Sequence, residues 1–219
     1  MIRDETYIPA LGNHALTPFY DVAIALLTRE RVWRQALLAQ VAPKSGDTVL
    51  DIGCGTGSFA VLLKKAAPGA TVIGLDPDRE ILERARMKAR AASVDVDFQH
   101  GYGNDAAAVA KHAGVTKVVS SLVFHQVPVA GKKAALASIF EALPAGGELH
   151  IADYGLQRTF AMRTLFRQVQ RLDGFENTEP NAKGMLPHFI ADAGFSDVRE
   201  TKIIPTLTGS ISLYAGRKI

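Results

Sequence analysis

The sequence has 219 residues, which is enough for one domain with a substantial buried core. Hydrophobic residues make up 47%, charged residues 21% and aromatic residues 7%, a composition typical of a globular α/β protein and unlike that of a disordered chain. The formal charge is +3, without the dense field of Lys and Arg that nucleic-acid-binding proteins carry, so no nucleic-acid partner is expected.

The first two thirds of the chain alternate between strands and helices, after a helical segment predicted between Pro18 and Val41. The predicted strands are Thr48–Ile52, Thr71–Leu75, Val94–Gln99, Lys117–Val123 and Glu148–Ala152, and the predicted helices between them are Ser58–Ala67, Asp78–Ala92, Asp105–His112 and Lys132–Leu143. Because strands that alternate with helices of this length form right-handed βαβ units, the pattern predicts a mainly parallel sheet with helices on both faces.

The alternation stops after Asp153. Helices are predicted over Phe160–Leu172 and Met185–Ala193, with a polar, turn-rich segment over residues 173–184 between them. Two further strands, Val198–Ile204 and Ser210–Ala215, finish the chain. Such a closing pair is typical of an antiparallel edge on a parallel sheet.

The single cysteine, Cys54, excludes an intrachain disulfide framework and a cysteine-rich zinc site, and no metal site is expected. The N-terminal residues carry charges of both signs and no apolar core, which argues against a signal peptide. The apolar stretches are too short to span a bilayer. We therefore expect a cytoplasmic protein without a transmembrane segment, and peripheral contact with a membrane stays open.

A glycine-rich turn, Gly53-Cys54-Gly55-Thr56-Gly57, joins the first predicted strand to its helix. Glycines let the backbone approach a ligand, and the helix that follows offers free N–H groups. Asp76 ends the second strand, where a carboxylate can accept hydrogen bonds from the ribose hydroxyls of an adenosine. A plain tight turn is the alternative, but the loop together with Asp76 favours a site for an adenosine-containing ligand.

The spacing of the glycines separates two classes of ligand. The nicotinamide-dinucleotide fingerprint places its third glycine at position 58, which is Ser58 here, whereas this chain has its third glycine at Gly57. No Tyr-x-x-x-Lys pair accompanies the loop. A nicotinamide-dependent oxidoreductase is therefore kept only as the alternative.

Four segments resemble motifs of one family. Residues Val49–Gly57 are very similar to the first motif of class I S-adenosylmethionine-dependent methyltransferases, and Val72–Asp76 is similar to the second. Val118–Val127 is similar to the fourth-strand motif of the ubiquinone/menaquinone methyltransferase-like branch, with Gln126 in place of a second histidine. Residues 146–149 resemble the turn into the fifth strand.

The resemblance implies a Rossmann-like methyltransferase fold of class α/β, with a seven-stranded, mainly parallel sheet, an antiparallel last strand and helices on both faces. It implies S-adenosylmethionine as cofactor, released as S-adenosylhomocysteine. It also implies one methyltransferase domain over residues 1–219, divided into an N-terminal helical cap (1–42), a cofactor-binding core (43–153), an acceptor-side helical insertion (154–195) and a closing strand pair (196–219).

The family's binding residues map onto matching positions of this sequence. They are Asp51, Gly53, Cys54, Gly55, Thr56, Gly57, Asp76, Pro77, Gly101, Tyr102, Ser121 and Leu122. Asp51 is expected to face the methionine ammonium through water, Asp76 to bind the ribose and Pro77 to lie against the adenine. Where the family often has Asp after the glycine that follows strand three, this chain has Tyr102. Stacking by Tyr102, or a polar contact from Asn104 or Asp105, stays open for the adenine.

The resemblance implies an in-line transfer of the methyl group to a small-molecule or lipid acceptor. A general base is needed only when the acceptor must lose a proton. His125 and Tyr20 are the candidate catalytic residues, each with a structural alternative, and His14 is a weaker candidate. The sequence does not distinguish among a quinone ring, a phospholipid and another metabolite as the acceptor. A non-catalytic protein that binds S-adenosylmethionine is a further alternative. The sequence does not indicate the oligomeric state.

Four arginines, Arg158, Arg163, Arg167 and Arg171, recur at helical spacing after strand five. A solvated helix face is the simpler interpretation, and attraction to anionic lipid headgroups or an acidic acceptor is the alternative. Aromatic and apolar residues of this region, Phe160, Met162, Phe166 and Phe175, indicate either core packing or an apolar wall for the acceptor.

Overall fold

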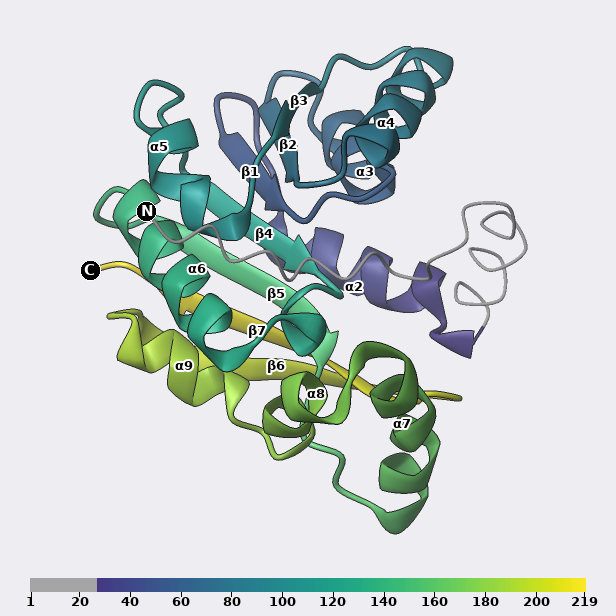
Figure 1. Ribbon diagram of the computed structural model, residues 1–219. Helices are drawn as coiled ribbons and strands as arrows, with labels where there is room; N and C mark the ends of the chain where they lie inside the picture. Colours follow the sequence, from purple (N-terminus) through teal and green to yellow (C-terminus); the bar gives the residue numbers. More distant parts are fainter. Residues whose placement is uncertain (1–26) are drawn as a thin grey trace.

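The computed structural model describes residues 27–219, and these residues form a seven-stranded sheet covered by helices on both faces (Figure 1). The order of the strands is β3-β2-β1-β4-β5-β7-β6. The strands are β1 (Thr48–Ile52), β2 (Thr71–Asp76), β3 (Asp97–His100), β4 (Lys117–Ser121), β5 (Glu148–Tyr154), β6 (Ser196–Thr206) and β7 (Gly209–Arg217). Neighbouring strands from β3 to β5 pair in parallel, and β7 is antiparallel to both β5 and β6. The predicted fold class is confirmed.

The helices follow the expected alternation. They are α2 (Glu30–Val41), α3 (Ser58–Ala66), α4 (Arg79–Ala91), α5 (Ala106–Ala110), α6 (Val129–Ala142), α7 (Phe160–Asp173), α8 (Phe175–Ala182) and α9 (Leu186–Asp192), with short 3-10 turns η2 (Gly103–Asp105) and η3 (Phe124–Gln126). None of the helices within residues 27–219 is long and apolar enough to cross a bilayer.

Two hydrophobic cores lie on opposite faces of the sheet. Val49, Val72 and Val119 pack on one face with side chains of α2, α3, α4 and α7. Their neighbours in the strands, such as Leu50 and Val118, turn to the other face and pack with α5, α6 and α9. The central strands are buried on both faces, which explains why they read as continuous apolar runs in the sequence.

Several element boundaries differ from those predicted; for example, β4 ends at Ser121 and α6 begins at Val129. The segment 173–184, expected to be a turn-rich loop, contains α8, because Thr178, Asn181 and Ala182 are buried there. The polar side chains of this segment point into the protein, which hid the helix from a pattern search based on apolar spacing. Strand β3 begins only at Asp97, and β5 continues to Tyr154 instead of ending at Ala152.

The order of the strands fixes where a ligand can bind. The chain leaves β1 for β2 and β3 on one side and then returns to β4 on the other side of β1. In open α/β sheets, the crevice outside the carboxyl ends of the strands at this reversal is the ligand site. The loop Gly53–Gly57 after β1 and residues Ser121–Gln126 after β4 flank that crevice.

Candidate functional site

The glycine loop is fixed to the end of the neighbouring strand β2. The backbone N–H groups of Gly53 and Cys54 donate hydrogen bonds of 2.8 and 3.1 Å to the carbonyl oxygen of Leu75. Gly57 N–H closes the turn onto Cys54 O at 2.9 Å. The loop is therefore preorganised by β1 and β2 before any ligand arrives.

The three glycines of the loop have positive φ angles but different surroundings. A Cβ atom at Gly53 would lie 2.3 Å from a Val123 methyl group, and one at Gly57 would lie 2.7 Å from the Phe98 ring. At Gly55, whose φ is +53°, a Cβ atom would meet nothing within 4 Å. Gly53 and Gly57 thus allow close packing, whereas Gly55 faces open space at the carboxyl edge of the sheet.

Asp76, at the end of β2, is 6% exposed and contacts the loop directly. Its Oδ2 accepts a hydrogen bond of 2.8 Å from Gly55 N–H, and its Oδ1 accepts one of 3.0 Å from Asp78 N–H. Burial raises the pKa of Asp76, and the two backbone hydrogen bonds oppose that rise. Each carboxylate oxygen keeps a further lone pair, so the predicted contact with ribose hydroxyls fits this geometry.

Asp51 in β1 is the other acidic residue beside the loop, and its environment is unusual. It is fully buried, and neither carboxylate oxygen has a hydrogen-bond partner within the described part of the chain. Burial raises the pKa of Asp51 to about 8, with the charge of Arg34 opposing and that of Asp76 adding to the rise. A buried carboxyl group without a partner is costly, so Asp51 fits a position that receives a cationic group or water when the ligand binds.

Lys88 of α4 contacts the hydroxyl groups at the start of α3. Its Nζ donates to Thr56 Oγ1 at 2.7 Å and to Ser58 Oγ at 2.6 Å. Cys54 lies within the loop, 8% exposed, and burial raises the pKa of its thiol. Cys54 is therefore an uncharged packing residue of the loop, and Thr56 is a polar residue at its rim.

The predicted adenine end lies where β3 leaves the sheet. Gly101 is buried and donates its N–H to Asp76 O at 3.1 Å, while the Tyr102 side chain is 49% exposed. Asp105 Oδ2 accepts the Tyr102 N–H at 2.8 Å. Stacking by Tyr102 and a polar contact from Asn104 or Asp105 both stay predictions for the adenine.

The end of β4 supplies the opposite wall of the crevice. Ser121 and Leu122 are partly buried, and Leu122 has a φ of +56°, which is uncommon for a residue with a side chain. Leu122 N–H donates to Ala152 O at 2.8 Å, and Leu122 O accepts from Gln126 Nε2 at 3.3 Å. Gln126, which replaces the second histidine of the family motif, thus holds the backbone of this turn.

His125 lies between two carboxylates. Its Nδ1 is 2.8 Å from Asp153 Oδ1 on β5, and its Nε2 is 3.3 Å from Asp173 Oδ2 at the end of α7. Burial opposes protonation, but Asp153 and Asp173 together outweigh it and raise the pKa of His125 to about 9. His125 is therefore an imidazolium at neutral pH, with both nitrogens engaged.

Asp153 anchors this group to the backbone. It is fully buried, and its Oδ2 accepts hydrogen bonds from Val123 N–H at 3.0 Å and from Phe124 N–H at 2.6 Å. The Asp153–His125–Asp173 bridge ties the turn after β4 to β5 and α7. This arrangement favours a positioning role for His125, and a role as general base would require Asp173 to leave Nε2.

A buried lysine lies in the same region. Lys132 on α6 is fully buried, and its Nζ donates at 2.6 Å both to Asn177 O and to Asn181 Oδ1 on α8. Burial lowers the pKa of Lys132 to about 8, against the attraction of Asp153. Asn181 also donates from Nδ2 to Tyr154 O at 3.1 Å. Lys132 and Asn181 therefore fix α8 against α6 and β5.

Lys132, Asp173 and Asn181 were missed from the sequence because they are distant along the chain and follow no motif. Lys132 does carry one signal. It falls on the apolar stripe of its helix, at the spacing shared by Val129, Leu136 and Ile139. A lysine on such a stripe is buried only when polar partners meet it.

Tyr20 and His14 lie outside the described residues. Pro77 is partly buried between β2 and α4, directly after Asp76. Phe166 is a fully buried core residue, whereas Phe160 and Phe175 are 85% and 59% exposed, so these aromatic residues do not form one apolar wall.

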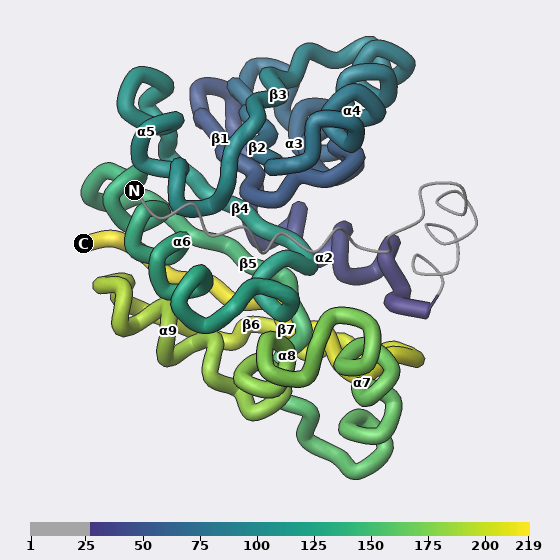
Figure 2. Tube along the Cα trace, viewed as in Figure 1, coloured from purple at the N-terminus to yellow at the C-terminus, as the bar shows by residue number. Residues whose placement is uncertain are grey.

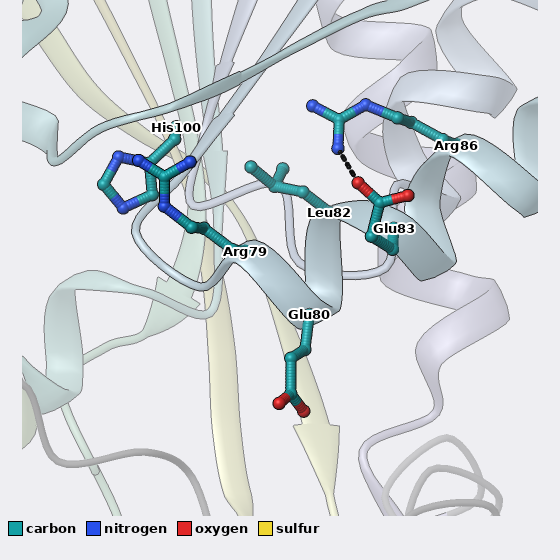
Figure 3. A pocket seen from close by; sticks show the side chains of 6 residues that line it. All are labelled: Arg79, Glu80, Leu82, Glu83, Arg86 and His100. Atoms are coloured by element: carbon teal, nitrogen blue, oxygen red, sulfur yellow. Dashed lines mark hydrogen bonds and ion pairs between the residues drawn. The ribbon is translucent and has the colours of Figure 1, made fainter.

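A cavity of about 250 Å³ opens beside β3 and α4, at the outer edge of the sheet (Figure 3). It is lined by Arg79, Glu80, Leu82, Glu83, Arg86 and His100. Arg86 is held by an ion pair of 2.6 Å with Glu83, and its other nitrogen donates to Phe98 O at 2.8 Å. The lining comes from α4 and β3 alone and includes no residue of the glycine loop.

Comparison with known proteins identifies the domain. A family model described as "Methyltransferase domain" matches residues 49–147, from β1 to the turn before β5. The demethylmenaquinone methyltransferase of Thermus thermophilus is 31% identical over 141 residues, which is 64% of this chain and 62% of that protein. The demethylmenaquinone methyltransferase of Deinococcus radiodurans is 36% identical over 89 residues, 40% of this chain and 37% of that protein. The chain thus matches less than two thirds of the length of these relatives.

Solved structures share the fold. The S-adenosylmethionine-dependent methyltransferase SibL superposes with a TM-score of 0.66 over 91% of this chain and 57% of that chain, at 21% identity. Human N-acetylserotonin methyltransferase, solved in complex with S-adenosylmethionine, superposes with a TM-score of 0.57 over 78% of this chain and 47% of that chain, at 19% identity. At these identities the superpositions establish the architecture and leave the chemistry to the residues of the site.

Proposed function

Because residues 49–147 form a class I methyltransferase domain related to that of the quinone C-methyltransferases, we propose that this chain transfers the methyl group of S-adenosylmethionine to a small-molecule or lipid acceptor. One observation carries the proposal. The loop after β1 presents the open face of Gly55 between two buried carboxyl groups, Asp51 and Asp76. Such a loop suits a ligand that has both a cationic amino acid end and a ribose.

The residues of the crevice have separate roles in this proposal. Asp51 attracts the ammonium of the cofactor, Asp76 binds the ribose hydroxyls, and Gly55 leaves room for the backbone to approach them. Pro77 and Tyr102 flank the adenine, and the backbone at Ser121 and Leu122 lies beside the methionine portion. Gly53 and Gly57 keep the loop in shape, with Cys54 and Thr56 completing it.

The bound cofactor supplies an activated methyl group, and the protein's task is to align the acceptor with it and exclude water. The turn after β4 and the helices α7 and α8 lie where an acceptor would enter, beside the carboxyl ends of β4 and β5 (Figure 1). In this proposal residues 154–195 form the acceptor side, and the His125 bridge holds them in place.

The relatives suggest which acceptor to test first. Both are demethylmenaquinone methyltransferases, so a reduced quinone ring is the first acceptor to test, with phospholipids and other metabolites after it. A catalytic role for His125 or Tyr20 stays a prediction. His125→Ala should leave S-adenosylmethionine binding nearly unchanged, and unchanged turnover would exclude His125 as the base. A cytoplasmic location and the absence of a nucleic-acid partner belong to the same proposal.

Calorimetry with S-adenosylmethionine, S-adenosylhomocysteine and NAD, run in parallel on the full chain, tests the cofactor. We expect both sulfur compounds to bind and NAD not to bind, because Ser58 stands where the dinucleotide loop needs its third glycine. Asp76→Ala should weaken S-adenosylmethionine binding by roughly tenfold or more, since a lost charge-assisted hydrogen bond costs about 1.5–3 kcal/mol. Binding of NAD alone would contradict the proposal in favour of the oxidoreductase alternative.

Transfer of a labelled methyl group to a reduced demethylated quinone, or to an extract of small molecules and lipids, tests the reaction. Binding of S-adenosylmethionine without transfer to any acceptor would favour the non-catalytic binder instead.

A further inference from the structure

The helices α7 and α8 expose large apolar side chains beside the crevice. Phe160 at the start of α7 is 85% exposed, and Leu172 and Phe175 near its other end are each 59% exposed. Arg167 and Arg171 are exposed between them. Figures 1 and 2 show α7 at one end of the molecule, on the far side from α3 and α4. These five residues are here called the α7 face.

The sequence sorts α7 into two sides. Phe160, Arg167 and Arg171 recur at i, i+7 and i+11, which places them on one stripe of the helix. Phe166 and Val169 lie on the opposite side and are buried, with the Phe166 ring 4.9 Å from that of Tyr154. Core packing therefore already has its own residues in α7, and it does not account for the exposed Phe160 on the outer stripe or for the exposed Leu172 and Phe175 at the end of the helix.

The charged residues of this segment are also divided between the inner and outer sides. Asp173 turns inward to His125, and Glu179 pairs with Arg163 and accepts from Gln170 at 2.9 Å. Within residues 27–219, Arg167 and Arg171 make no hydrogen bond or ion pair. Glu176 is the exposed acid of the neighbouring turn. The outer stripe is thus positively charged, although the segment as a whole contains nearly as many acids as bases.

We propose that the α7 face docks this protein on an anionic lipid bilayer. Aromatic and leucine side chains enter the boundary between headgroups and acyl chains, and arginines bind the phosphates above it. Helix α7 is also the helix that the Asp153–His125–Asp173 bridge fixes to the carboxyl edge, so a docked α7 places the crevice at the membrane surface. Docking of this kind does not depend on the proposed methyl transfer or on the identity of the acceptor.

Flotation of the full chain with lipid vesicles tests it. We expect the protein to float with vesicles of phosphatidylcholine mixed with phosphatidylglycerol and to float much less with phosphatidylcholine alone. Raising the salt concentration should release the protein, since the attraction is partly electrostatic. Arg167→Gln with Arg171→Gln should weaken binding on the order of tenfold, and Phe160→Ser with Phe175→Ser by several-fold or more.

A matched control uses the other exposed basic helix. Helix α4 carries Arg84, Met87 and Arg90 at the opposite end of the molecule, and Met87 is 58% exposed. Arg84→Gln with Arg90→Gln removes the same charge and should leave flotation nearly unchanged. An equal loss in this control would show attraction by net charge alone and overturn the proposal, as would an absence of binding to the anionic vesicles.

Two further measurements separate the remaining outcomes. Calorimetry with S-adenosylmethionine should give the same affinity for wild type and the α7-face variants, so failure to bind lipid is distinguishable from failure of the proposed function. Light scattering after gel filtration detects a second copy of the chain on the same face. A dimer that the Phe160→Ser and Phe175→Ser changes dissociate, with no lipid binding, would replace the membrane by a subunit interface.

Discussion

At the scale of single residues, the buried carboxyl group of Asp51 gives the strongest indication that a ligand binds in the crevice. It is buried and unpartnered within the described residues, and its pKa is raised to about 8. An acid whose folded pKa lies above its unfolded value of 3.8 makes the folded state progressively less stable as the pH rises from 3.8 to about 8. A cation bound beside it would remove that cost.

The raised pKa of Asp51 predicts that the protein releases a proton when the ligand binds. At pH 7 the free protein holds the Asp51 proton, and the ammonium of S-adenosylmethionine should expel it, releasing up to about one proton per ligand. Calorimetry in buffers of different ionisation enthalpy measures this number. Asp51→Asn should abolish the release and weaken binding, whereas release that persists in this variant would assign the proton to another group.

The glycines of the loop give a second residue-scale prediction, because two of them differ only in their surroundings. Gly55→Ala should cost about 1–2 kcal/mol of stability from its positive φ, and it should weaken S-adenosylmethionine binding, since its Cβ enters the open crevice. Gly57→Ala meets the same strain and also the Phe98 ring, which adds about 1–3 kcal/mol.

Urea unfolding and calorimetry on both variants separate the two effects. Gly57→Ala should lose the most stability, and Gly55→Ala should lose more affinity for each kcal/mol of stability lost. The reverse order would mean that Gly55 is a packing residue and that the ligand lies elsewhere.

At the scale of elements, the His125 bridge makes the docking of α7 depend on pH. A base whose folded pKa is raised stabilises the fold fully below its unfolded pKa of 6.5, and this stabilisation is lost as the pH rises through about 9. Lys132 acts in the opposite sense between about 8 and 10.5, because burial lowers its pKa and deprotonation relieves that cost. Between pH 6.5 and 8 the effect of His125 is separate from that of Lys132, and the loss of stability from Asp51 over the same range is common to wild type and to variants at position 125.

Nuclear magnetic resonance of the histidine rings should show His125 titrating near 9. Asp173→Asn should lower that pKa and speed amide exchange in α7. In urea unfolding between pH 6.5 and 8, wild type should lose on the order of 1–2 kcal/mol more than His125→Gln, because both proteins share the loss from Asp51. His188→Gln, in an exposed position on α9, is the matched control and should behave as wild type. A His125 that titrates at its ordinary value would mean that the two carboxylates do not hold it.

Some of the helices and strands could be predicted from the sequence and others could not. The alternation of apolar runs and amphipathic helices was sufficient to predict the parallel strands of the core. Strands β1 and β4 are buried on both faces, so their continuous apolar runs fit the middle of a parallel sheet. The alternation was insufficient for α8, where the buried residues include the polar Thr178 and Asn181, and for the bridge that joins His125 to two carboxylates. Those side chains meet only after β5 and α7 have packed, so no local pattern connects them.

The candidate site likewise has features that the sequence predicts and features that depend on tertiary packing. The glycine loop and Asp76 follow from spacing along two neighbouring strands, and the structure brings them within 2.8 Å of each other. The different surroundings of Gly53, Gly55 and Gly57 depend on Val123, from the turn after β4, and on Phe98, from β3. Local sequence therefore identified the loop, and tertiary packing determined which of its glycines faces the ligand.

At the scale of the whole molecule, ligand binding should stabilise one cooperative unit. The seven strands form a single sheet, and the crevice draws on β1, β2 and β4, so a ligand in it restrains elements on both sides of the reversal. A ligand that binds only the folded state adds about 2.7 kcal/mol of stability at a hundred times its dissociation constant. For a domain of this size, each kcal/mol raises the midpoint of thermal unfolding by about 2–4 °C.

Saturating S-adenosylmethionine or S-adenosylhomocysteine should accordingly raise the melting temperature by about 5–10 °C, and NAD at the same concentration should leave it unchanged. Asp76→Ala should reduce the shift, because the ribose contact arises from the folded sheet. The α7-face variants should keep the full ligand-induced rise in melting temperature, since the substituted side chains are exposed and lie outside the crevice. Equal stabilisation by all three ligands would show that the crevice recognises only the adenosine they share, and the assignment of Asp51 to the methionine end would then be wrong.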